Sequence, residues 1–536
     1  MSEAFPVRGS VRGTTACAAA DHPLAAAVGM AVLRDGGSAA DAAVAMGTVM
    51  TVVQPQFSHL GGDVFALTFE AATGEVRALN SSGPAPRSSE AQAYRDMGGI
   101  PEAGPLAVTV PGAVDGWWRL HQAGGRLPWK RLLEPAIGYA REGFPASRGL
   151  ALAMDTGRER VYPSGAFKET FGGVAGEGGQ AVTQPALART LEAVAAGGPA
   201  AFYEGAVARE CMAALNGRGA CFTAEDWQPP GRWEEPLAVR FGGYRVHSQP
   251  PPSQGFALLL SLTAYERMVA GDGGHTAAPL LQVRAAVAAF DARTRLAADP
   301  DGGRFDARAL LRDEAVTAMV RDPARASLAT VGDGDTTYLL AVDAQGNAVS
   351  LIQSLFAAWG SGVYVPATGV FMNNRMCGFR LKVGHPNELA GGRRPNHTLH
   401  SWLATIDPPE LLPLARKVGE RPAAARLRAV GGTPGADRQV QTNLQLLDAL
   451  LREGMDPQAA IDRPRWSIGT PAGGGEVVEV ETRERDELGE LFRRGGLEVR
   501  PLAAWGATGK AYVALLEPGK IAVGADLRGE GQALVC

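Results

Sequence analysis

Two adjacent threonines behind an acidic, glycine-rich stretch are the residues whose spacing points most directly to chemistry. In the segment 332–354, GDGDTTYLLAVDAQGNAVSLIQS, Asp335, Thr336 and Thr337 stand directly before a run of strand-forming residues. A threonine hydroxyl is a weak nucleophile until a base removes its proton. The threonine's own α-amine becomes such a base when the preceding peptide bond is cut. Its ordinary pKa of about 8 suits work near neutral pH.

Cleavage before Thr336 would make this residue an N-terminal nucleophile. Gly332 and Gly334 permit the strained backbone that brings a hydroxyl onto the preceding carbonyl carbon. The same letters also fit an ordinary turn before a strand, and the segment by itself does not separate the two interpretations.

The elements around this junction alternate in blocks of helix and strand. TTYLLAVD and AVSLIQS, joined by the turn AQGN, predict a β-hairpin directly after the junction. Helical periodicity from 22 to 34 ends at a Gly-Gly pair, and Ser38 to Asp41 then forms a capping box that starts a second helix. Residues 110–230 are mostly helical in pattern, with a second capping box at Thr223–Asp226, and 511–526 predicts a closing hairpin. This alternation favours sheet layers covered by helices.

Size, charge and cysteine content exclude several classes. The 536 residues require a large buried core, and a net charge of −4 gives no basic field for nucleic acid. The five cysteines are scattered and never spaced C-x-x-C, so neither a disulfide frame nor a zinc site is expected. No metal or organic cofactor is predicted. No window is apolar enough to span a membrane and no export signal is recognised, so the prediction is a cytoplasmic protein.

Nine segments in order give the chain a resemblance to the γ-glutamyltransferase family of N-terminal-nucleophile hydrolases. Each segment is weak alone, and their common order is specific. They are HPLAAAVGMAVLRDGGSAADAAVA, GGDVFALTFEAATGEVRAL, VTVPGAVDGW, QPALARTLEAVAAGGPAAFYEG, PPPSQG, DTTYLLAVDAQGNAVS, GSGVYVPATGVFMNN, GGTPGADRQVQ and the closing GAD.

The resemblance implies an α+β fold, the four-layer αββα sandwich. It also implies autoproteolysis between Asp335 and Thr336, giving a large subunit 1–335 and a small subunit 336–536 headed by the catalytic Thr336. Ser354 matches the hydroxyl residue that hydrogen-bonds the nucleophile. Gly435 and Ala436 match two glycines whose N–H groups form the oxyanion hole. Alanine at the second position is a concern if its φ must be positive.

The positions that hold glutamate in the family are mostly changed here. Ser82 replaces an arginine, Phe356 an asparagine and Gly378 an aspartate. Arg375 follows the paired asparagines that end in Asn374, and His397-Thr398 replaces two serines. Loss of an acid and gain of an arginine favour a substrate with a carboxylate but no ammonium group. The predicted substrate-binding residues are Asn374, Arg375, His397, Thr398 and Phe356, although Arg375, His397 and Phe356 also fit purely structural roles.

These changes resemble the oxamate amidohydrolase branch of the family. The predicted function is a self-processing threonine amidohydrolase that cleaves a small carboxylate-bearing amide through an acyl-enzyme. Three alternatives stay open: a γ-glutamyl hydrolase or transferase acting on glutathione-like peptides, a C–C hydrolase of a keto-acid in secondary metabolism, and an unprocessed, inactive scaffold or binding protein. The expected partners are the amide substrate and the chain's own two subunits, with no nucleic acid or membrane. A homo-oligomer is possible.

Overall fold

A computed structural model describes residues 8–161, 165–302, 305–321, 336–407, 425–469, 477–483, 486–507 and 509–536. The predicted cleavage residue Asp335 lies outside the described residues, whereas Thr336 lies inside them.

The hairpin predicted after Thr336 is the centre of one sheet. Strand β10 (Thr337–Val342) pairs antiparallel with β11 (Ala348–Ser354), and every residue of both strands is buried. Side chains alternate along β10: Leu339 and Ala341 face one hydrophobic cluster, and Tyr338 and Leu340 face another. A strand buried on both faces must lie inside a layered structure, not at its surface.

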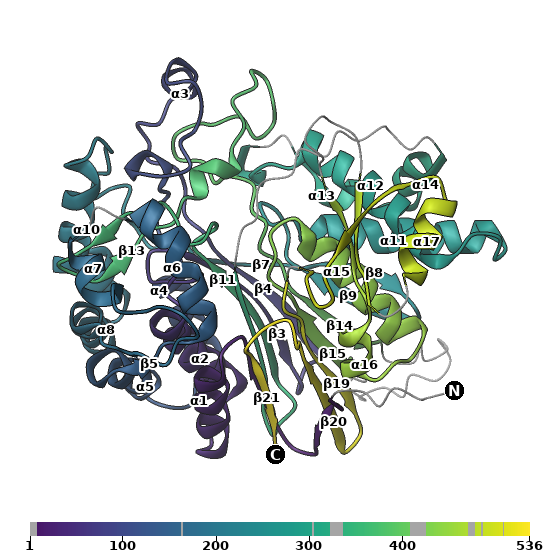
Figure 1. Ribbon diagram of the computed structural model, residues 1–536, viewed down its shortest axis with the longest axis horizontal. Coiled ribbons are helices and arrows are strands. Elements are labelled where there is room, and N and C mark those ends of the chain that lie inside the picture. The colour runs from purple at the N-terminus through teal and green to yellow at the C-terminus, as the bar shows by residue number, and fades with distance from the viewer. Residues whose placement is uncertain are drawn as a thin grey trace, which may run out of the picture.

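Two seven-stranded sheets in the described part of the chain are stacked face to face (Figure 1). The sheet around the hairpin has the order β21 (Gln532–Val535), β2 (Cys17–Ala20), β10, β11, β3 (Asp63–Glu70), β4 (Glu75–Ser81), β7 (Arg232–Glu234). The other has the order β1 (Val11–Gly13), β20 (Lys520–Ala525), β19 (Tyr512–Glu517), β15 (Arg426–Gly432), β14 (Trp402–Ile406), β9 (Tyr244–Ser248), β8 (Leu237–Phe241).

Apolar side chains from both sheets meet in one inter-sheet cluster, which includes Phe65, Tyr338, Ile352, Val430 and Tyr512. Removal of this apolar surface from water stabilises the stack by roughly 25 cal/mol per Å².

Helices cover the outer face of each sheet (Figure 1). Over the hairpin sheet, the layer contains α1 (Pro23–Arg34), α2 (Ala39–Val53), α4 (Ala113–Gly124), α5 (Trp129–Glu142), α6 (Arg148–Val161), α7 (Gly165–Phe171), α8 (Pro185–Gly197), α9 (Pro199–Tyr203) and α10 (Ala206–Asn216). Over the other sheet, it contains α11 (Gly255–Asp272), α12 (Ala278–Leu296), α13 (Ala307–Leu310), α14 (Asp313–Arg321), α15 (Arg438–Leu447), α16 (Pro457–Asp462) and α17 (Glu487–Arg494).

Short elements complete the fold. They are α3 (Ala91–Asp96), the strand pairs β5 (Phe144–Pro145) with β6 (Ala181–Val182) and β12 (Tyr364–Val365) with β13 (Val370–Phe371), the sheet β16 (Trp466–Gly469), β17 (Val477–Glu481) and β18 (Glu498–Leu502), 3-10 turns at Pro105–Ala107, Pro300–Gly302 and Arg375–Gly378, and a π-helical turn at Asp448–Arg452. The layers are therefore helix, sheet, sheet, helix, which is the αββα sandwich predicted from the sequence.

The two predicted capping boxes have different outcomes. Ser38 and Asp41 exchange side-chain and backbone hydrogen bonds at the start of α2, as predicted. Thr223 and Asp226 make the same reciprocal bonds, but only a turn follows. The prediction of a helix there is wrong because Asp226 also accepts a hydrogen bond from Arg87 N, and Pro229-Pro230 follow too soon for a helix to continue.

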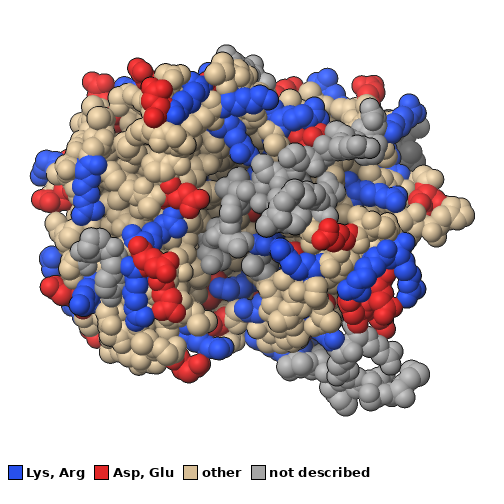
Figure 2. Space-filling view, turned by 45° about the horizontal axis from the view of Figure 1, so that its top comes forward, with Lys and Arg blue, Asp and Glu red and all other residues tan. Residues whose placement is uncertain are grey.

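Acidic and basic side chains are interspersed over the described surface that Figure 2 shows, with no broad patch of one sign. Among the described helices, none has the length and apolar character needed to cross a membrane.

Candidate active site

The hydroxyl of Thr336 lies at the open end of the central hairpin. Thr337 is opposite Gln353 in the strand register, so Thr336 comes opposite Ser354. Thr336 Oγ1 donates a hydrogen bond to Ser354 Oγ at 3.3 Å, and Ser354 Oγ also accepts from Phe356 N at 2.7 Å. Thr336 is only 3% exposed, so the surroundings of its hydroxyl are set by protein groups.

Gln353 fixes this end of β11 to the helical layer. Its side-chain oxygen accepts from Trp117 Nε1 at 3.0 Å, and its nitrogen donates to Gly47 O and Ser58 Oγ. Ser354 is the next residue, so these bonds limit the movement of the hydroxyl that faces Thr336.

The turn after Ser354 brings Phe356 and Asn374 together. Phe356 has φ +88°, an unfavourable backbone conformation for an aromatic residue. Asn374 holds the turn, because its side chain accepts from Ala357 N at 3.0 Å and donates to Glu102 O at 3.1 Å. Asn374 thus supports the loop next to the hydroxyl pair. Its predicted contact with substrate stays a prediction.

Arg375 and His397 meet on a carboxylate that the sequence did not single out. Asp63 Oδ2 lies 3.4 Å from Arg375 Nε and 3.1 Å from His397 Nε2, and all three side chains are fully buried. The guanidinium also lies 4.4 Å from the ring centre of Phe356. Nε is ion-paired with Asp63, whereas Nη1 and Nη2 make no hydrogen bond to a described residue, so Arg375 keeps unused donor capacity.

Burial sets the charges of this cluster. Desolvation raises the pKa of Asp63 to about 7, against the opposing charge of Arg375. It lowers the pKa of Arg375 to about 10, although Asp63 acts in the other direction. Burial, with the Arg375 charge, holds the pKa of His397 well below its usual range. Neutral His397 therefore donates from Nε2 to Asp63 while its Nδ1 accepts from Leu399 N.

Gly435 and Ala436 form the bend between β15 and α15. Their φ values are +119° and +48°, so the second position does require the left-handed region, and Ala436 adopts it under strain. Neither backbone N–H donates a hydrogen bond to another described residue, although Gly435 O and Ala436 O accept from Arg438 N and Gln439 N. Two N–H groups in one bend that have no partner among the described residues are the arrangement that an oxyanion hole needs.

The end of β15 lies against β10, which brings this bend toward Thr336. A Cβ atom on Gly432 would fall 2.4 Å from the ring of Tyr338, two residues after Thr336. Ser350 on β11 also donates to Gly431 O at 3.2 Å. Gln254 reaches the bend from the other side, donating to Ala436 O at 3.0 Å and to Thr398 O at 2.7 Å.

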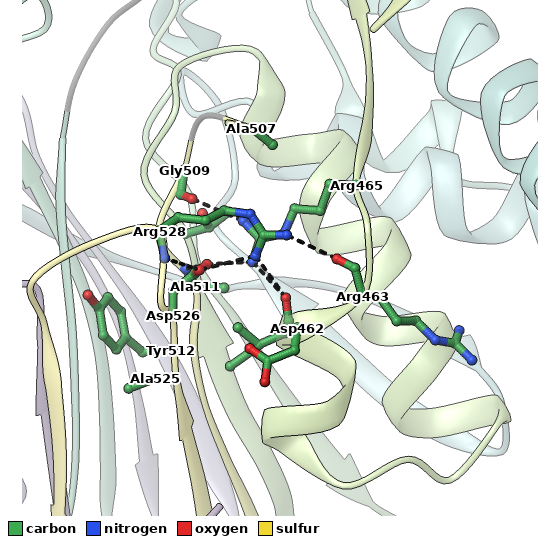
Figure 3. A network of polar contacts seen from close by, with 12 residues as sticks. Asp462, Arg463, Arg465, Ala507, Gly509, Ala511, Tyr512, Ala525, Asp526 and Arg528 are labelled. Carbon is green, nitrogen blue, oxygen red and sulfur yellow. Dashed lines mark hydrogen bonds and ion pairs between the residues drawn. The ribbon is translucent and has the colours of Figure 1, made fainter. Parts of the chain in front are cut away.

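A network of four charged residues with buried side chains, Arg465, Asp526, Arg528 and Glu481, lies beside Gly509. Figure 3 shows Arg465, Asp526, Arg528 and Gly509. Arg465 donates to Gly509 O at 2.9 Å and pairs with Asp526 at 2.5 Å. A Cβ atom on Gly509 would come within 2.7 Å of Pro434 O, so this backbone touches the bend. The second ion pair of the network joins Arg528 to Glu481, and Glu481 also accepts a hydrogen bond from Ala507 N. Asp526 belongs to the closing GAD segment noted in the sequence.

Thr398 and Phe356 also line a small polar pocket together with Arg293 and Arg380. The described residues contain no cluster of three or more His, Cys, Asp or Glu side chains arranged to bind a metal ion.

The structure brings together Thr336 with Ser354 and Phe356, and Arg375 with His397. Sequence reasoning gave no role to Asp63 or Gln254, although both lie in segments that match the family, nor to Arg293, which lies in none of them.

An αββα sandwich with a buried threonine hydroxyl at the head of a central strand defines the class of N-terminal-nucleophile hydrolases. The sequence profile of the gamma-glutamyltranspeptidase family matches residues 25–536, so the chain belongs to that family. Its members are enzymes, hydrolases or transferases of this class.

Relatives match over nearly full length. The chain is 33% identical to the oxamate amidohydrolase proenzyme of Klebsiella pneumoniae, covering 97% of this chain and 98% of the relative. It is 32% identical to the glutathione hydrolase-like YwrD proenzyme of Bacillus subtilis, and the match covers 98% of this chain and 99% of the relative. Among solved structures, cephalosporin acylase from Bacillus halodurans superposes with a TM-score of 0.85 at 29% identity, covering 100% and 99% of the two chains.

Proposed function

We propose that this chain is a self-processing amidohydrolase of the family, acting on a small amide that carries a carboxylate. The bond cut in processing is Asp335–Thr336, which gives subunits 1–335 and 336–536. The observation that carries the proposal is the hydrogen bond from Thr336 Oγ1 to Ser354 Oγ at the head of β10.

The chemistry needs only groups of the chain and water. The α-amine of Thr336 takes the hydroxyl proton as Oγ1 bonds to the amide carbonyl carbon. The N–H groups of Gly435 and Ala436 donate to the oxyanion, and the C–N bond breaks as the leaving nitrogen takes the proton. Water then attacks the ester, which releases the acid and restores the threonine hydroxyl.

Arg375 is the proposed carboxylate ligand. Its unused donors suit a carboxylate, and Asp63 and the ring of Phe356 hold the guanidinium plane. His397 acts on Arg375 through their shared Asp63, and Thr398 supplies a neighbouring hydroxyl. Asn374 and Phe356 shape the turn that separates this group from Ser354. The relative named for oxamate, the smallest such amide, supports a substrate of this kind.

Assays with two amides test the substrate class. Ammonia released from oxamate supports the proposal. Glutamate released from a γ-glutamyl anilide without any ammonia from oxamate would instead favour the glutathione hydrolase alternative, toward which the Bacillus relative points. The Thr336→Ala variant is the control, and it should stay uncut and inactive with both amides.

A further inference from the structure

A small polar pocket lies beside the proposed catalytic groups and has no role in the steps above. The side chains that matter in its lining are Arg293, Phe356, Arg380, His385, Asn396 and Thr398. Its free volume is about 10 Å³, about the smallest space that holds one water-sized group. The pocket therefore has room for no more than one small polar group.

One direct contact and two connections through neighbouring residues join the pocket wall to the proposed reaction groups. The backbone N–H of Phe356 donates to Ser354 Oγ. Thr398 is tied to Ala436 because Gln254 donates to the carbonyl oxygens of both. Arg293 Nη1 lies 2.6 Å from the carboxylate of Asp437, the residue after Ala436. The pocket wall is thus connected to Ser354 and to the bend at Gly435 and Ala436.

The pocket carries more positive than negative charge. Arg293 is 4% exposed and shares its charge with Asp437. Arg380 makes no ion pair within 4.0 Å to any residue that the structure describes. Burial and then the charge of Arg293 lower the pKa of Arg380, whereas the charge of Asp437 acts in the other direction. Two neighbouring cations that share one carboxylate are stabilised by a further anion.

The remaining polar groups fit a carboxylate. His385 Nε2 lies 2.9 Å from Thr294 O, and its Nδ1 accepts from Asn387 N. Both ring nitrogens are therefore used within the protein, and the charged donors left to a ligand are those of the two arginines.

We propose that this pocket binds a second carboxylate of the substrate, one carried by the leaving amine. The inference rests on the proposed function and specifies its leaving group. Arg375 contacts the ring of Phe356, and that same residue lines the pocket. A short acyl group whose carboxylate is on Arg375 cannot also reach the pocket, so the amine side must fill it. The product amine is then an amino acid: the C–N bond breaks, its nitrogen takes the proton, and water hydrolyses the ester.

Two amides and two variants of the full, processed chain test this assignment. Oxamate and N-oxalylglycine share the acyl group, and only the second carries a carboxylate on the amine. The wild type should hydrolyse N-oxalylglycine with a kcat/KM at least tenfold higher. Arg380→Gln should remove most of this preference through a higher KM, since a charge-assisted hydrogen bond is lost. Arg295→Gln is the control for loss of one arginine charge, because Arg295 lies on α12 two residues after Arg293 but is exposed and paired with Asp291.

Equal effects of Arg380→Gln on both amides, or none on either, would overturn the pocket assignment. If the wild type hydrolyses neither amide, the proposed function fails. The pocket assignment is then tested separately by measuring the binding of N-oxalylglycine in a calorimeter. Binding at least tenfold weaker to Arg380→Gln than to Arg295→Gln would uphold the pocket as a carboxylate site, and equal binding would reject it.

Discussion

At the scale of single residues, the pair Thr336 and Ser354 has a clear division of roles. Thr336 Oγ1 donates and Ser354 Oγ accepts, so Ser354 orients the hydroxyl proposed to attack. Ser354→Ala removes this acceptor in a buried site and should lower kcat about 10- to 100-fold. Ser354→Thr keeps a hydroxyl and should stay near the wild-type rate. Steady-state kinetics on oxamate compare them, and equal losses in both variants would show that the hydroxyl itself does not matter.

Substitutions of Ala436 test the geometry of the proposed oxyanion bend, which consists of Gly435 and Ala436. Its φ of +48° costs a residue with a Cβ about 1 kcal/mol relative to glycine. Ala436→Gly should therefore raise the free energy of unfolding by up to about that amount and leave kcat unchanged, as urea denaturation and kinetics would show. Ala436→Val should lower kcat, since a β-branched residue resists this φ. A variant with valine and full activity would mean that the bend does not act in catalysis.

At the scale of elements, Arg465 and Asp526 in Figure 3 hold the start of the closing hairpin. Gly509 there contacts Pro434, next to the proposed oxyanion bend at Gly435 and Ala436. Gly509 has φ +89° and leaves no room for a Cβ beside Pro434 O. Gly509→Ala should push the bend away and lower kcat about 10²-fold, while KM changes little, because the oxyanion forms only in the transition state.

Gly519 supplies the control for this substitution. Its φ is +69°, and a Cβ there would meet nothing within 4 Å. Gly519→Ala therefore carries a similar backbone strain without the contact. It should lose less stability than Gly509→Ala and keep the wild-type kcat. The same kcat in both would show that the network does not position the bend.

The sequence predicted those elements whose signals are local. The hairpin around AQGN and the capping box at Ser38 follow from adjacent residues, and both form. The capping box at Thr223 has the same local bonds but no helix, because the residues after it cannot continue one. Asp63 escaped prediction because it pairs with His397, 334 residues away, and no local pattern encodes that contact. Arg375 and His397 were found only as substitutions in a family pattern, which did not reveal their shared carboxylate.

At the scale of the whole molecule, the proposed subunits are interleaved. Strands β10 and β11 of 336–536 lie between β2 and β3 of 1–335, and β1, β8 and β9 complete the other sheet. Separation would break both sheets and the inter-sheet core. The processed fragments should therefore elute together in native gel filtration and separate only in denaturant. Elution of either fragment alone without denaturant would contradict this topology.

Asp63 also joins the two proposed subunits, and it gives the folded chain a pH dependence. Its pKa rises from the ordinary 3.8 to about 7, so the folded chain binds this proton more tightly than the unfolded chain. The resulting stability is fully present below pH about 4 and is lost as the pH rises to about 7. Asp63→Asn has no such proton. From pH 4 to pH 8 the urea midpoint of the wild type should fall relative to that variant, and a constant difference would refute the assignment.

The central claim is that one peptide bond is cut to expose the amine of Thr336. Intact-mass spectrometry of freshly purified, active protein tests it directly. The account predicts two masses, for 1–335 and 336–536, and a single full-length mass in the Thr336→Ala variant. Full activity from a population in which every molecule keeps the 335–336 bond would contradict it.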